Sequence, residues 1–303
     1  MFIKPEVVTL NRYLIALLSI MVICPITSAF AQNAKCIVGD CRNGWGVFED
    51  VAGNRYKGSF SNGSITGKGS FFWTNGDQYE GDFVDGKRTG KGTFTWADGN
   101  RYEGDFVNGK RTGKGKLTWA NGNYYEGDFV DGAQTGKGTF VWADGSHYEG
   151  NFVDGKMEGQ GKLTWPNGDY YEGDFTNDQR TGQGTLVWTD GGRYEGDFVD
   201  GVRTGVGKLF WPNGDRYEGD FVDNVRTGKG KLFWANGDRY EGDFVDDKRT
   251  GRGAFIWANG DRYEGEFIDD HRLHTGRYIF NGRTDEGSEA EILEIEGNKN
   301  WHE

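Results

Sequence analysis

The sequence predicts an all-β protein, an elongated single-layer antiparallel ribbon of repeated β-hairpins that is curved and twisted. Tryptophan recurs with a 23-residue period from Trp73 to Trp257, and tyrosine recurs with the same period from Tyr56 to Tyr263. Glycine is abundant, with 52 residues, alongside 11 Trp, 14 Tyr and 21 Phe. A fixed period of this length is typical of repeat architectures, and glycine together with aromatic residues favours strands joined by tight turns. Ten units fit between residues 44 and 273.

The N-terminal segment has the features of an export signal. Two basic residues precede an apolar run over 13–24, and the small-residue sequence Ser-Ala-Phe-Ala follows at 28–31. The run is shorter than the roughly 20 residues that a membrane span needs. Residues 1–31 are therefore predicted to be a signal peptide that is cleaved before Gln32, and the protein is expected to be periplasmic or extracellular. The alternative is an uncleaved segment that anchors the chain in the membrane.

Residues 32–43 are predicted to form a cap at the first edge of the array. They contain Cys36 and Cys41, the two cysteines that remain after cleavage. Export places this pair in an oxidising compartment, where a disulfide is favoured. Because the spacing differs from the C-x-x-C of redox motifs, the expected disulfide is structural.

One unit shows how the repeat makes a hairpin. Two β-rich runs flank Asn75-Gly76, a strong hairpin signal. Side chains alternate between the faces of a strand, so only a three-residue loop over 74–76 pairs Phe71 with Tyr79 and unites the aromatic residues on one face. Such a loop ends in a left-handed residue, where glycine is favoured. Glycine occupies that position in all ten units, at Gly53, Gly76, Gly99, Gly122, Gly145, Gly168, Gly191, Gly214, Gly237 and Gly260.

The two faces of the predicted sheet differ. Charged and polar residues such as Glu80, Asp82 and Lys91 alternate with the aromatic ones and are expected to form a solvated face with cross-strand ion pairs. The aromatic face has no helix to cover it, and an uncovered apolar stripe usually marks an interaction site. Longitudinal stacking of the aromatic rings is the alternative. The predicted interaction face comprises Trp73, Tyr79, Phe83, Trp96, Tyr102, Phe106, Trp119, Tyr125, Trp142, Tyr148, Trp165, Tyr171, Trp188, Tyr194, Trp211, Tyr217, Trp234, Tyr240, Trp257 and Tyr263.

The outer turns and the C-terminal end depart from the pattern. Four outer turns, at 177–178, 223–224, 246–247 and 269–270, lack the usual glycine, and we expect their geometry to differ. Residues 274–303 are predicted to contain a capping strand and an acidic tail, since 276–280 begin an incomplete eleventh unit. A short helix is one interpretation of the acidic residues 285–296.

Charge and residue content argue against several function classes. The net charge is −12 with a pI of about 4.9 and no basic stripe, which disfavours nucleic acid and an anionic membrane surface. His271 and His274 near Asp269 and Asp270 lack the spacing of a metal site. The array offers no nucleophile beside a base. We therefore expect a protein that is not an enzyme, with no cofactor, no metal and no small-molecule substrate.

The repeat resembles a known family. The run from Tyr102 to Gly115, YEGDFVNGKRTGKG, is similar to the MORN (membrane occupation and recognition nexus) repeat, and the similarity extends from residue 44 to about 280. The resemblance implies an elongated ribbon of hairpins associated with scaffolding, self-association, membrane proximity and phospholipid binding. Some family members carry a lipid kinase domain, but only residues 281–303 follow this array, so no kinase activity is expected.

Two functional hypotheses follow from these observations. The first is a non-enzymatic scaffold or protein-interaction module of the cell envelope, which binds a protein partner or a second copy through the aromatic face. The alternative is a membrane-associated module that binds lipid or glycan, since aromatic rows suit sugar faces although the negative charge opposes anionic head groups.

Overall fold

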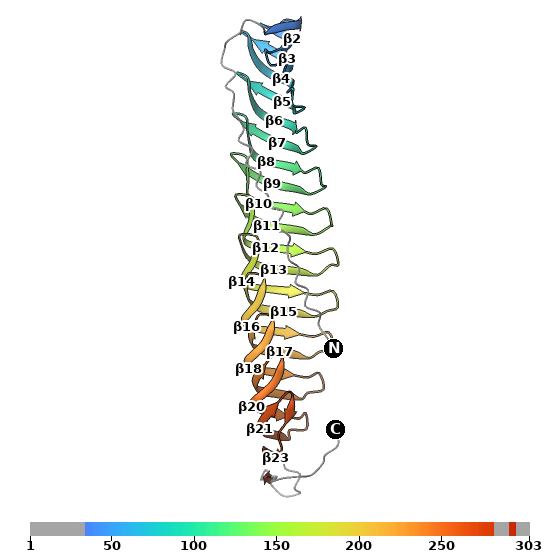
Figure 1. Cartoon of the computed structure of the whole chain (residues 1–303), viewed down its shortest axis with the longest axis vertical. Helices are drawn as coiled ribbons and strands as arrows, with labels where there is room; N and C mark the ends of the chain where they lie inside the picture. Colours follow the sequence, from blue (N-terminus) through green and yellow to red (C-terminus); the bar gives the residue numbers. More distant parts are fainter. Residues whose placement is uncertain (1–33, 282–290, 295–303) are drawn as a thin grey trace.

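A computed structural model describes residues 34–281 and 291–294 of the chain. These residues form one antiparallel sheet and contain no helix, and Figure 1 shows the strands stacked along a single long axis. The all-β repeat fold is therefore confirmed. The strands are β1 (Lys35–Gly39), β2 (Gly44–Glu49), β3 (Arg55–Ser61), β4 (Ser64–Phe72), β5 (Gln78–Val84), β6 (Lys87–Thr95), β7 (Arg101–Val107), β8 (Lys110–Thr118), β9 (Tyr124–Val130), β10 (Ala133–Val141), β11 (His147–Val153), β12 (Lys156–Thr164), β13 (Tyr170–Thr176), β14 (Gln179–Val187), β15 (Arg193–Val199), β16 (Val202–Phe210), β17 (Arg216–Val222), β18 (Val225–Phe233), β19 (Arg239–Val245), β20 (Lys248–Ile256), β21 (Arg262–Ile268), β22 (His271–Arg272), β23 (Arg277–Phe280) and β24 (Glu291–Glu294).

The inner loops have the predicted three-residue form. Phe71 pairs with Tyr79, the Trp73 amide donates to the Asp77 carbonyl at 3.0 Å, and the Gly76 amide donates to the Trp73 carbonyl at 3.0 Å. Gly76 has φ +96°, a left-handed conformation that costs glycine least. The loop therefore leaves both aromatic sets on one face of the sheet.

Successive inner loops are joined by a side-chain hydrogen bond. Asp77 Oδ1 accepts from the Ala97 amide of the next unit at 2.9 Å, and Asp169 Oδ1 accepts from the Thr189 amide at 2.8 Å. Two units have Ser146 and Gly192 at this acceptor position, and neither residue has a side-chain carboxylate or amide oxygen that could accept the bond. In both cases the next loop begins with proline, which has no N–H to satisfy. The two prolines are Pro166 and Pro212.

The outer turns keep one backbone conformation whether or not they contain glycine. Asp85 and Gly86 have φ values of 46° and 74°, and Asp246 and Asp247 have 50° and 67°. The expectation that the four turns without glycine differ is therefore wrong for the backbone, because Asp and Asn tolerate the left-handed region. The difference lies in the side chain, since Asp247 Oδ1 accepts from the Arg226 amide of the preceding unit at 3.0 Å.

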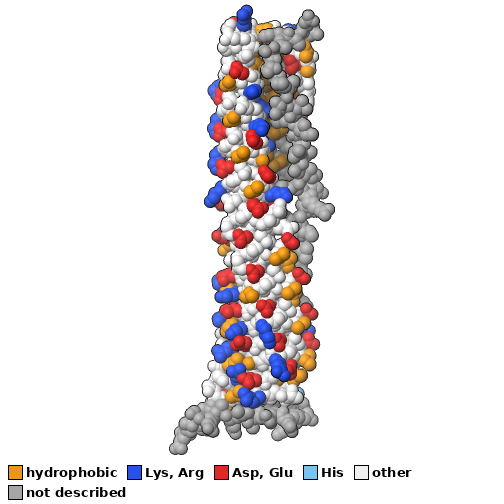
Figure 2. Space-filling model, turned by 90° about the vertical axis from the view of Figure 1, so that its left-hand side faces the viewer, with side chains coloured by type: hydrophobic (Ala, Val, Ile, Leu, Met, Phe, Trp, Pro, Cys, Tyr) orange, Lys and Arg blue, Asp and Glu red, His pale blue; other side chains and the backbone are white. Residues whose placement is uncertain are grey.

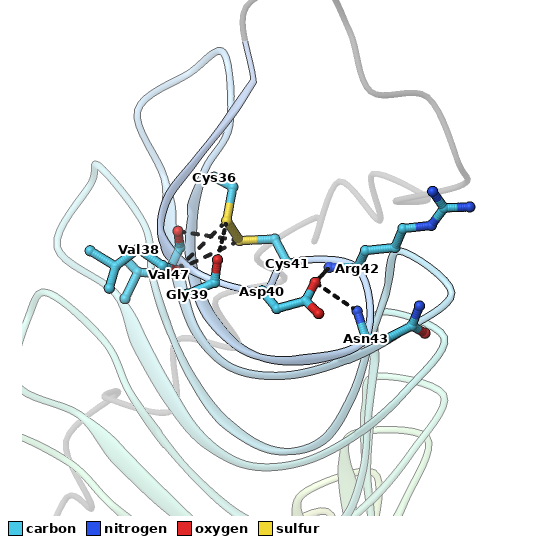
Figure 3. The surroundings of a disulfide bond; sticks show 8 residues. All are labelled: Cys36, Val38, Gly39, Asp40, Cys41, Arg42, Asn43 and Val47. Atoms are coloured by element: carbon cyan, nitrogen blue, oxygen red, sulfur yellow. Dashed lines mark hydrogen bonds between the residues drawn. A yellow bond between two sulfur atoms is a disulfide. The ribbon is translucent and has the colours of Figure 1, made fainter.

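Each hairpin bends sharply near its middle. In the pairing of β5 with β6, Asp82 faces Thr89 and Gly81 faces Gly92, so Gly90 and Lys91 form a bulge. The bend carries the outer turn back over the inner loop. Bulges of this kind recur along the sheet, and Figure 3 shows the first hairpins curved into a U. The sheet is thus a deep trough with its aromatic face inside.

The floor of the trough is a row of tyrosines that lie flat on glycine. Tyr171 is fully buried, and its hydroxyl lies 3.1 Å from the Asp174 carbonyl oxygen and 3.2 Å from that of Thr181. A Cβ atom added at Gly184 would clash with the Cε2 atom of its ring. Phe175 and Phe198 flank the ring edge-on at 5.2 and 5.0 Å, a favourable geometry for aromatic pairs. This arrangement repeats in each unit and forms one continuous core.

The two ends of the array are closed differently. Cys36 and Cys41 form a disulfide with an S–S distance of 2.07 Å, and Cys41 is buried at the start of the core inside the first bend (Figure 3). At the other end β23 pairs with β21, and β24 pairs with β23. A strand therefore lies in the acidic segment for which a helix was considered.

The predicted signal peptide falls on residues outside the described ranges. Among the described residues, no helix has the length and apolarity required to cross a membrane.

Candidate functional site: the tryptophan–arginine rim

The outer face of the trough is covered by paired charges. Lys91 Nζ lies 2.8 Å from Asp105 Oδ1, and Lys114 Nζ lies 2.7 Å from Asp128 Oδ1. The lysines are largely exposed, so each pair contributes little to stability. A shallow groove between these charge rows follows the backbone of the glycine row. The expected solvated face is present, and its charges largely neutralise one another.

The predicted aromatic interaction face separates into two layers in the structure. Its tyrosines and phenylalanines are buried, from Tyr79 and Phe83 at 1% and 3% exposure to Tyr263 at 0%. All nine of its tryptophans, by contrast, are half-buried and lie at the opening of the trough. The trough is thus filled by its own side chains, and only the tryptophan row can be reached from solvent. Whether a partner binds there stays a prediction.

A row of arginines that the sequence analysis missed accompanies the tryptophans. In seven units the guanidinium carbon of an arginine lies 4.9–5.8 Å from the ring centroid of the tryptophan that precedes the inner loop of the same unit. This distance is within range of a cation–π interaction. These arginines recur with the period of the tryptophans, a signal that could have identified them. The pairs are Arg88 with Trp73, Arg111 with Trp96, Arg180 with Trp165, Arg203 with Trp188, Arg226 with Trp211, Arg249 with Trp234 and Arg272 with Trp257.

The contact between these residues requires the bend in the hairpin. Trp73 lies beside the inner loop and Arg88 beside the outer turn, opposite Phe83. A straight strand would hold the two ends of this hairpin roughly 20 Å apart, at about 3.3 Å per residue. The arginine side chain reaches across the trough to the indole, which places both residues at its opening. We call the nine tryptophans and seven arginines the Trp–Arg rim.

Six of the seven arginines, all except Arg272 of the last unit, donate to the outer turn of the next unit. Arg111 Nη2 donates to the Gly132 carbonyl oxygen at 2.7 Å, and burial lowers the pKa of Arg111 from its usual value. Arg226 instead meets a carboxylate, with Nε 2.9 Å from Asp247 Oδ1. The rim is therefore held in place by backbone and side-chain acceptors from the neighbouring unit.

Residues typical of catalytic or metal sites do not converge in the described part of the chain. No group of three or more His, Cys, Asp or Glu there is placed to hold a metal ion. His271 and His274 are exposed, in β22 and shortly after it. The fold and the rim define a repeat protein with an elongated aromatic and cationic edge.

The chain belongs to the MORN repeat family. The family model matches nine consecutive repeats over residues 56–78, 79–101, 102–124, 125–147, 148–170, 171–193, 194–216, 217–239 and 240–262, which is more than half of the chain. Repeats of this family indicate a repeat module of the protein-interaction type. No curated protein matches the chain.

Solved structures that resemble the chain share only limited similarity. A mutant TCP10 domain of Danio rerio CPAP is 11% identical with a TM-score of 0.29, covering 73% of this chain and 92% of that chain. The wild-type domain in complex with a peptide of Danio rerio STIL is 12% identical with a TM-score of 0.27, covering 83% and 99%. The TCP domain of Drosophila melanogaster SAS-4, in complex with a proline-rich motif of Ana2, is 14% identical with a TM-score of 0.27, covering 59% and 84%.

Proposed function

We propose that this protein is an exported, non-catalytic scaffold of the cell envelope that binds a protein partner, or a second copy of itself, along the Trp–Arg rim. The observation that carries the proposal is the half-buried tryptophan row above a fully buried aromatic core. Tryptophan and arginine are the residues that most often dominate binding energy at protein interfaces.

The geometry of the array favours an extended partner. Units are separated by two strand spacings, roughly 9.6 Å, and the nine units that carry a rim tryptophan present it over roughly 77 Å. A partner that contacts several units gains affinity from each contact without needing a deep pocket. A rigid row of this kind suits a scaffold better than a small-molecule binding site.

Export is the part of the proposal that rests on residues 1–31. The apolar run and the small residues at 28–31 support cleavage before Gln32. The Cys36–Cys41 disulfide is consistent with an oxidising compartment. Mass spectrometry of protein purified from the exporting cell is expected to give a chain that begins at Gln32, and a chain that retains residues 1–31 would contradict cleavage.

Photo-crosslinking in the cell tests the binding surface. A benzophenone amino acid placed at Trp165 on the rim is expected to give a discrete adduct with a protein partner or a second copy. The matched control carries the same group at Lys162, whose side chain lies on the outer face over the Tyr170 ring. Adducts from Lys162 alone, or a strict monomer without adducts at either position, would rule out the rim as the binding surface.

A further inference from the structure

Two adjacent units of the rim lack their arginine. The equivalent positions after Trp119 and Trp142 are occupied by Gln134 and Met157, and neither tryptophan has a cation over its ring among the described residues. Trp119 and Trp142 remain half-buried and pack on Phe140 at 5.3 and 4.6 Å. The cationic row that covers the other seven tryptophans is thus interrupted near the middle of the rod.

Asp178, an acidic side chain at the same place, has no arginine partner within the described ranges. Asp178 occupies the turn position at which Asp247 and Asp270 bind Arg226 and Arg249, but here the preceding unit supplies Met157. Asp178 accepts a hydrogen bond from the Met157 amide at 2.8 Å and forms no salt bridge with the described residues.

The pKa values of the two kinds of turn aspartate differ in direction. Burial raises the pKa of Asp178, and the neighbouring Glu158 acts in the same direction against Lys156. Burial also acts on Asp270, but the hydrogen bonds and charge of Arg249 hold its pKa below the usual value. A cation beside Asp178 would therefore restore the arrangement that its counterparts already have.

The segment that contains the interruption is the most acidic of three segments of equal length. The segment from Trp119 to Asp178 contains three lysines, no arginine and eleven Asp or Glu, a net charge of −8. The stretches of equal length on either side, 59–118 and 179–238, carry +2 and −1. On the face drawn in Figure 2, blue side chains gather toward both ends of the rod, whereas red ones continue through its middle.

We propose that Trp119, Trp142 and Asp178 form a docking site for a basic segment of a protein partner, whose cationic side chains take the places of the two missing arginines. The inference rests on the proposed function and assigns the partner's chemistry. Cation–π contacts and an acidic surround favour guanidinium or ammonium groups at this site. An anionic lipid surface or nucleic acid would meet like negative charge at this site and be repelled.

The spacing of the two tryptophans suggests the form of the segment. Equivalent positions in adjacent units lie roughly 9.6 Å apart, which is twice the strand spacing. In a polyproline II helix, residues i and i+3 lie on the same side and are separated by about 9.3 Å. Two arginines three positions apart in such a segment match the spacing of the two indoles that have no cation in the described part of the chain.

A synthetic peptide tests the site directly. We use acetyl-Pro-Arg-Pro-Pro-Arg-Pro-amide with the purified full chain and measure binding by isothermal titration calorimetry. Saturable binding of one peptide per chain is expected, which weakens with added salt. The peptide with glutamate in place of both arginines is the control and is expected not to bind.

Restoring the missing arginines is the decisive variant. Gln134→Arg/Met157→Arg gives these units the arginines that their neighbours have, and these arginines fill the site. The affinity for the peptide is expected to fall by about tenfold or more, because two cation–π contacts are lost. Circular dichroism confirms that the variant is folded. Should it misfold, Asp178→Asn and Trp142→Leu are measured separately, and each is expected to weaken binding.

The failures of the two proposals can be told apart. Unchanged peptide affinity in Gln134→Arg/Met157→Arg and in Trp142→Leu would overturn the docking site. If crosslinks from Trp165 still report a partner in that case, the rim binds by other contacts and the proposed function stands. Equal binding of the arginine and glutamate peptides would also overturn the site, because recognition would not depend on cationic side chains.

Discussion

At the scale of single residues, glycine and tyrosine depend on each other. Glycine pairs such as Gly173 and Gly184 lie beneath the ring of Tyr171, and no side chain fits between the ring and the backbone. The tyrosine hydroxyl in turn bonds to carbonyl oxygens of both strands. This contact explains why a sheet with one layer can bury its aromatic residues without a covering element.

A double-mutant cycle tests this dependence. Gly184→Ala places a methyl group against the Tyr171 ring and is expected to destabilise the protein by about 1–3 kcal/mol through overpacking. In a Tyr171→Ala background the space is free, so the same change is expected to cost less than about 0.5 kcal/mol. Urea denaturation of the four proteins gives the coupling, and additive costs would contradict the packing.

The buried tyrosines also predict an alkaline limit to stability. Burial raises the pKa of Tyr56, Tyr102 and Tyr171 to about 12, against an unperturbed value of about 10. The folded state therefore keeps its protons longer than the unfolded chain, and stability that is complete below pH ~10 is lost as pH rises toward the folded pKa. Absorbance at 295 nm should show these tyrosines ionising together with unfolding, not at pH ~10 in a folded protein.

At the scale of the hairpin, the backbone amide at the start of each inner loop is dealt with in one of two ways. Most units join consecutive loops by an Asp or Asn oxygen that accepts an amide, as Asp169 does for Thr189. Where the acceptor is absent, at Ser146 and Gly192, proline removes the donor. Each solution leaves no backbone N–H unsatisfied at the edge of the trough.

Exchanging one solution for the other is therefore expected to be tolerated. Asp169→Ser removes the acceptor of the Thr189 amide and is expected to cost about 1 kcal/mol. Adding Thr189→Pro removes the donor and is expected to recover most of that loss, as Pro166 does after Ser146. Thermal denaturation measures the three variants, and a double variant less stable than Asp169→Ser alone would contradict the explanation.

Part of this structure was predictable from the sequence, for reasons that lie in the hairpin. The period, the three-residue loop and the aromatic face all follow from strand parity, because Phe71 and Tyr79 must share a side. The bend was not predicted, because the sequence at the Gly90-Lys91 bulge does not differ from that of an ordinary glycine-rich strand. The role of Arg88 was missed because arginine beside a turn is usually solvated, and only the bend brings it to Trp73.

At the scale of the whole molecule, each unit contacts mainly its neighbours, so the rod is a stack of nearly equal layers. The docking proposal rests on the departures from this equality. The interruption of the Trp–Arg rim at Trp119 and Trp142 coincides with the most acidic part of the array. The other seven tryptophans of the rim each have an arginine of the chain itself over the ring.

The trough is filled by its own side chains and can be approached only at the rim. Hydroxyl-radical footprinting with mass spectrometry tests it in the purified protein, since modification follows the exposure of each side chain. Tyr171 and Phe175 are expected to be protected, whereas Trp165 and Val199, which is 55% exposed, are expected to be clearly modified. Modification of the tyrosine row at the rate of the tryptophans would show that the trough is open to solvent, which would contradict a self-filled core.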